Sequence, residues 1–106
     1  MKWREVCRSE ALWPERGSAA LLDGQVIALF RTRGDELYAV SNIDPCTGVS
    51  AMSRGIVGDR GGEPTVASPL HKQVFSLRTG RCLTEDAELA TYPVRDRGGV
   101  VEVGLP

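Results

Sequence analysis

Short apolar runs separated by turn residues cover most of this 106-residue chain. Residues 26–30 are apolar throughout, which is typical of a strand that is covered on both faces. Residues 101–103 read Val-Glu-Val, the alternation of a half-buried strand. Glycine-containing turns interrupt the runs, and the sequence therefore predicts β-hairpins with turns at 23–24, 34–35, 78–80 and 97–99.

Helical signals are few and short. Ser9 is placed to cap a turn that Pro14 ends, and residues 84–90 can form another. Residues 55–62 are rich in glycine but lack the lysine and hydroxyl residue that end a phosphate-binding loop, so we interpret them as a flexible connection. The pattern predicts one all-β domain over residues 1–106, a sandwich or a barrel.

The composition is that of a soluble globular protein, with 42% hydrophobic and 25% charged residues. The net charge of −1 gives no broad basic surface for nucleic acid. Residues 1–5 are charged where a signal peptide needs an apolar core, and the densest apolar run is too short to cross a bilayer. Three cysteines without framework spacing suit a reducing compartment, so we expect the protein in the cytoplasm.

Two proline-containing loops carry the residues of chemical interest. The first, at 42–48, reads Asn-Ile-Asp-Pro-Cys-Thr-Gly, and the second, at 68–73, reads Ser-Pro-Leu-His-Lys-Gln. These loops resemble in spacing the two loops of a Rieske [2Fe–2S] domain, Cys-Pro-His and Cys-Pro-x-His, which supply two cysteines and two histidines. Residues 75–80, Phe-Ser-Leu-Arg-Thr-Gly, match the Phe-x-Leu-x-Thr-Gly sequence that follows the second loop in that family.

A more specific resemblance extends over nearly the whole chain. The chain resembles the small subunit of the assimilatory NAD(P)H-dependent nitrite reductase, a Rieske-like domain without the Rieske ligands. The residues that carry this resemblance lie at 3–7, 41–45, 53–57, 66–70 and 92–101. It implies an all-β fold, a Rieske-like antiparallel β-sandwich of two packed sheets with the two ligand-type loops side by side at one end.

The resemblance also assigns the four ligand positions. The two cysteine positions fall on Asp44 and Ser68, and the two histidine positions fall on Cys46 and His71. Because a [2Fe–2S] cluster requires thiolates where Asp44 and Ser68 offer oxygen, we expect no cluster and no other cofactor in this chain. Two alternatives stay open, a zinc site formed by Asp44, Cys46 and His71, and a nucleophilic Cys46–His71 pair that lacks a third residue to orient the base.

For function, the resemblance implies an accessory subunit without catalytic residues. Its partner is then a large subunit that carries FAD, a [4Fe–4S] cluster and sirohaem and reduces nitrite to ammonium with electrons from NAD(P)H, for nitrate and nitrite assimilation. We expect the end that carries these two loops, including Asp44 and His71, to contact that subunit, with Arg54 and Lys72 at the interface. We expect neither nucleic acid nor a membrane as a partner. The alternatives are a Rieske-type ferredoxin that carries electrons and a stand-alone Rieske-like module that binds another protein.

Overall fold

The computed structural model describes residues 1–106, which form ten strands and two single-turn 3₁₀ helices. The strands are β1 (Lys2–Arg8), β2 (Gly17–Leu22), β3 (Gln25–Arg31), β4 (Leu37–Ser41), β5 (Ile56–Arg60), β6 (Glu63–Ala67), β7 (Val74–Ser76), β8 (Thr91–Tyr92), β9 (Val94–Arg97) and β10 (Val100–Leu105). The helices are η1 (Ser9–Ala11) and η2 (Met52–Arg54). The predicted turn at Ser9 is confirmed, although no side chain caps it. The all-β expectation is confirmed, and none of the helices has the length and apolar character needed to cross a membrane.

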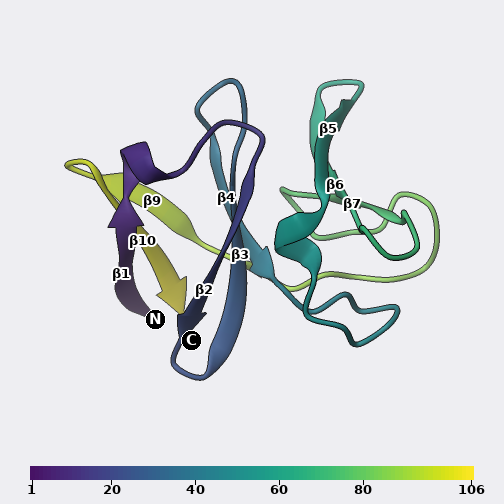
Figure 1. The fold of residues 1–106 in the computed structure, drawn as a ribbon, viewed down its shortest axis with the longest axis horizontal. Helices are drawn as coiled ribbons and strands as arrows, with labels where there is room; N and C mark the ends of the chain where they lie inside the picture. Colours follow the sequence, from purple (N-terminus) through teal and green to yellow (C-terminus); the bar gives the residue numbers. More distant parts are fainter.

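The strands form three antiparallel sheets that lie side by side along the molecule (Figure 1). One sheet has the order β1-β10-β9, the central sheet has the order β2-β3-β4-β8, and the third has the order β5-β6-β7. The expected sandwich of two sheets is therefore present with one addition. The small third sheet, which lies on the right in Figure 1, covers the face of the central sheet that the first sheet leaves open.

Strand β3 explains this arrangement because both of its faces are buried. Ile27 and Leu29 are buried on one side, where they pack with apolar residues of β10. Ala28 and Phe30 are buried on the other side, where they pack with apolar residues of β6 and β7. Burial of a side chain such as Ile27 or Phe30 stabilises the fold by about 1.5–3 kcal/mol. The prediction of a strand covered on both faces is confirmed.

Tight turns join the strands where the sequence predicted them. Leu22 lies opposite Gln25, and the two residues between them have positive φ, 49° at Asp23 and 81° at Gly24. Positive φ at both central residues is the conformation of a type I′ turn, which aspartate and glycine adopt more readily than other residues. The other three predicted hairpins are confirmed by the pairing of Arg31 with Leu37, Phe75 with Cys82 and Arg97 with Val100.

Two segments differ from the interpretation of the sequence. Residues 55–62 are not a flexible connection, because β5 pairs with β6 along its whole length and Gly61 and Gly62 form the turn, at φ of 60° and 92°. Glycine and proline both weaken a strand pattern, and Pro64 lies inside β6. The sequence pattern therefore did not predict this hairpin. Residues 84–90 contain no helical turn and run in irregular conformation after the β7 hairpin.

Candidate functional site at the loop end

Three loops lie together at the end of the molecule that is on the right in Figure 1, and we call this region the loop end. They are the first loop, which in the structure extends over residues 42–50, the second loop, residues 68–73, and the third loop, residues 83–88. Ser68 of the second loop is hydrogen-bonded to Asp44 of the first, and Glu85 of the third loop is hydrogen-bonded to Cys46 of the first. The predicted adjacency of the two ligand-type loops is confirmed.

The first loop is anchored to the fold by Asn42, which is 4% exposed. Its side-chain oxygen accepts the Ser53 N–H at 2.6 Å, and its amide nitrogen donates to the Ser50 hydroxyl at 2.8 Å. Its backbone oxygen accepts the N–H groups of Ala51 and Met52. Because Asn42 directly follows β4, these bonds fix the direction in which the first loop leaves the central sheet.

Asp44 and Ser68, the two residues at the cysteine positions, are buried and bonded to each other. Asp44 is 0% exposed and Ser68 is 2% exposed. The Ser68 hydroxyl donates to Asp44 Oδ2 at 2.5 Å, a short bond of the kind that forms between a hydroxyl and a carboxylate. Asp44 Oδ1 accepts the Cys46 N–H at 2.8 Å, and Ser68 Oγ accepts the Leu70 N–H at 3.2 Å.

These contacts test whether the two loops fit a [2Fe–2S] cluster. The cluster would need two thiolates at the positions of Asp44 and Ser68, and both residues offer oxygen instead. Both carboxylate oxygens of Asp44 and the hydroxyl of Ser68 are already engaged in bonds within the protein. The donor set of this chain therefore does not fit the cluster, in chemistry or in orientation.

The zinc hypothesis is not supported by the positions of Asp44, Cys46 and His71. No three side chains of the histidine, cysteine, aspartate or glutamate type form a group that could hold a metal ion. The reason is orientation, since the Asp44 carboxylate is turned inward to Ser68 whereas Cys46 and His71 are exposed. The nucleophilic pair fails as well, because the hydrogen bond of the Cys46 thiol goes to Glu85 and not to His71.

Glu85 also controls the protonation of Cys46. Cys46 Sγ donates to Glu85 Oε1 at 3.2 Å. That hydrogen bond, slight desolvation of the thiol and the negative charges of Glu85 and Asp44 raise the pKa of Cys46 from its ordinary value of 9.0 to about 11. A thiol held in its protonated form is a weak nucleophile and a weak metal ligand at neutral pH.

This arrangement predicts slow alkylation of Cys46. At pH 8 we expect iodoacetamide to modify Cys46 roughly tenfold faster in Glu85→Gln than in the parent, because the larger thiolate fraction outweighs the lower nucleophilicity of a less basic thiolate. Rates are measured by mass spectrometry of the peptide that contains Cys46. The control is Asp86→Asn, since Asp86 is exposed but makes no bond to the thiol. Equal rates in all three proteins would contradict the assignment of Glu85.

The loop end also carries apolar side chains that are exposed, which the analysis of the sequence missed. We call them the apolar rim: Ile43 and Val49 of the first loop, Leu70 of the second and Leu83 of the third, 39–48% exposed. The signal in the sequence was the presence of apolar residues inside loops that are otherwise polar. Arg54, at the end of η2, and Lys72, in the second loop, are both exposed.

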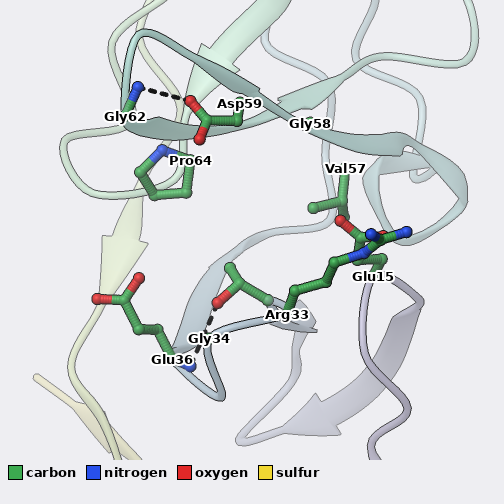
Figure 2. A pocket seen from close by; sticks show the side chains of 10 residues that line it. Glu15, Arg33, Gly34, Glu36, Val57, Gly58, Asp59, Gly62 and Pro64 are labelled. Carbon is green, nitrogen blue, oxygen red and sulfur yellow. Dashed lines mark hydrogen bonds and ion pairs between the residues drawn. The ribbon is translucent and has the colours of Figure 1, made fainter.

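A cavity of about 300 Å³ lies away from the loop end, between the β3–β4 turn and the β5–β6 hairpin (Figure 2). Glu15 and Arg33 at its rim form an ion pair of 2.9 Å. The Asp59 carboxylate accepts the Gly62 N–H at 2.7 Å, and most of the other lining residues are polar or glycine. Small-molecule sites are mainly apolar with a few unpaired polar groups, so this cavity is not a candidate.

Comparisons with known proteins place these observations in context. The chain matches the Rieske-like [2Fe–2S] domain family over residues 2–104. It is 40% identical over 105 residues to the nitrite reductase (NADH) small subunit of Escherichia coli strain K12, a match that covers 96% of each chain. A crystal structure of a Mycobacterium tuberculosis protein described as an NADH-dependent nitrite reductase small subunit superposes with a TM-score of 0.93 at 44% identity, covering 96% of this chain and 93% of that one.

Two further relatives bear on the alternatives. The nitrite reductase [NAD(P)H] large subunit of Klebsiella oxytoca contains a segment that is 42% identical over 103 residues, covering 96% of this chain and 11% of that protein. The 3-phenylpropionate/cinnamic acid dioxygenase ferredoxin subunit of Shigella flexneri is 40% identical over 96 residues, covering 88% of this chain and 85% of that protein. The chain is 42% identical to the reductase segment and 40% identical to the ferredoxin subunit, so overall identity does not separate the two alternatives.

Proposed function

Because the chain belongs to the family of Rieske-like [2Fe–2S] domains and, within it, to the nitrite reductase small subunits, we propose that it is the accessory subunit of an NAD(P)H-dependent nitrite reductase that forms ammonium. The observation that carries this proposal is a match along 96% of both chains together with oxygen donors at Asp44 and Ser68. The large subunit then holds FAD, a [4Fe–4S] cluster and sirohaem. The present chain contributes a binding surface and no reacting group.

The second candidate is a ferredoxin that carries electrons, which the similarity to a dioxygenase ferredoxin subunit favours. This function requires a redox centre in the chain itself. Asp44 and Ser68 argue against it, because their oxygens bond to each other instead of pointing at an open ligand position. A visible absorption spectrum of the protein purified without air separates the two functions, since only a ferredoxin is coloured.

We also propose that the subunit works in the cytoplasm. Its three cysteines, Cys7, Cys46 and Cys82, are all free thiols. A small domain without disulfides suits a reducing compartment.

The proposed contact surface is the loop end. The exposed side chains of the apolar rim occur there together with the exposed charges of Arg54 and Lys72. Such a mixture of apolar and charged side chains is typical of protein interfaces. The relative from Klebsiella oxytoca supports a large reductase subunit as the partner, because a domain similar to this chain is part of that polypeptide.

Reversing two charges tests this surface. We expect Arg54→Glu with Lys72→Glu to weaken binding of the co-expressed large subunit roughly tenfold and to lower NAD(P)H-dependent nitrite reduction in proportion, without unfolding the domain. Binding is measured by co-purification and titration, and folding by circular dichroism. The control is Lys2→Glu with Arg97→Glu, two exposed residues of the β1-β10-β9 sheet. Unchanged binding of the first variant would move the interface elsewhere, for example to Trp13, which is 66% exposed.

A further inference from the structure

We propose that the hydrogen bond between Ser68 and Asp44 takes the place of the iron–sulfur cluster as the cross-link between the first and second loops. Asp44 and Ser68 are then positioning residues that hold the apolar rim in the arrangement the large subunit binds; this last step rests on the proposed function. The cross-link itself concerns only this chain and holds for the free subunit.

The connectivity of the loops is the first argument. The backbone of the first loop bonds within itself and to η2, as in the bond from Asp44 N–H to the Val49 carbonyl at 2.8 Å. The backbone of the second loop also bonds within itself, as in the bond from Ser68 N–H to the Gln73 carbonyl at 2.8 Å. No backbone hydrogen bond joins the two loops, and the Ser68–Asp44 bond is the only side-chain hydrogen bond that does.

Burial gives the second argument. A carboxylate that is 0% exposed requires hydrogen-bond donors, and Asp44 has one on each oxygen, from Cys46 and from Ser68. Ser68 Oγ in turn accepts the Leu70 N–H. The result is a continuous chain of bonds from the backbone of the second loop to the backbone of the first, through the two side chains that stand at the lost cysteine positions.

The third argument is the lack of another cross-link of comparable kind. The larger side chains of these loops do not form a core between them, since Ile43, Val49 and Leu70 are all 41–48% exposed. In a Rieske domain, ligand bonds to the cluster join the two loops. Here a short buried hydrogen bond performs that task, between the two residues that stand at the cysteine positions.

A matched pair of serine variants tests the proposal. Ser68→Ala removes the cross-link. Ser76→Ala is the control, because Ser76 is also buried and its hydroxyl donates to the Glu63 carboxylate at 2.6 Å, but that bond joins β7 to β6 and not the loops. Both variants are examined by hydrogen exchange of backbone amides and by titration with the large subunit.

We expect Ser68→Ala to raise amide exchange at least tenfold in both loops, including residues 44–49 on the far side of the lost bond, and Ser76→Ala to leave these amides unchanged. Affinity for the large subunit is expected to fall roughly tenfold in Ser68→Ala alone, because the loops must then be ordered on binding. Equal exchange of the first loop in the parent and in Ser68→Ala would overturn the cross-link.

A substitute variant and the binding of the parent keep the outcome decisive. If Ser68→Ala does not fold, Asp44→Leu takes its place, since leucine is similar in size to aspartate and has no atom that can accept the Ser68 hydroxyl or donate to it. In that variant, too, faster exchange in the second loop supports the cross-link and unchanged exchange overturns it. If the parent itself does not bind the large subunit, the proposed function fails while the exchange measurement still decides the cross-link.

Discussion

The variant that combines Asp44→Cys, Cys46→His and Ser68→Cys is expected to take up iron and sulfide on anaerobic reconstitution, whereas the parent is expected to stay colourless with far less than one iron per chain. With His71 already in place, these changes complete a set of two cysteines and two histidines. His71 is exposed, so its ring is free to turn toward a ligand position. We expect weak binding, because the hydrogen bonds that orient metal ligands have to form anew around the substituted side chains.

The measurements are the visible absorption spectrum and the analysis of iron and inorganic sulfide. The control is Cys46→His alone, which supplies both histidines but leaves Asp44 and Ser68 hydrogen-bonded to each other. We expect this control to remain free of iron. A parent protein that is brown on purification, with about two irons and two sulfides per chain, would contradict the accessory-subunit proposal and favour the electron carrier.

Phe30→Ala is expected to destabilise the domain by about 3–5 kcal/mol, the usual cost of removing a buried aromatic ring. Phe30 is 0% exposed and belongs to the cluster in which the central sheet packs against β6 and β7. For a chain of this size the melting temperature should fall by roughly 20 °C. Thermal and urea unfolding followed by circular dichroism measure both quantities.

The matched control is Leu21→Ala on the neighbouring strand β2, where the side chain is 72% exposed. Its effect should lie within about 0.5 kcal/mol, since little apolar surface is lost. If the two variants were equally stable, the third sheet would not pack on β3, and the positions of the loops that extend from this sheet would be in doubt.

The strands and hairpins could be predicted because their signals are local. Val26 to Phe30 is apolar without interruption, and Asp23-Gly24 is a dipeptide that favours a two-residue hairpin turn. The hairpin of β5 and β6 could not be predicted in the same way. Its strands contain Gly58 and Pro64, which weaken a strand pattern, and β5 is held by pairing with β6 more than by any pattern of its own.

The resemblance at the loop end likewise named Asp44, Cys46, Ser68 and His71 as the ligand positions, and it identified the family correctly. It could not show that Glu85 bonds to Cys46, because 39 residues separate them and nothing in the spacing indicates contact. The sequence also left open a zinc site formed by Asp44, Cys46 and His71, which the positions of these side chains do not support. Spacing gives the position of a residue in a loop but not the direction of its side chain.

The sequence by itself determined the all-β class, the hairpin turns and the oxygen donors at the two cysteine positions, since each of these depends on residue type and short-range order. Only the tertiary structure decided that Ser68 donates to Asp44, that Cys46 is bonded to Glu85 and that the apolar rim is exposed. These features depend on how loops from different sheets meet. That meeting is governed by the burial of β3 on both faces, which brings the third sheet and its loops against the end of β4.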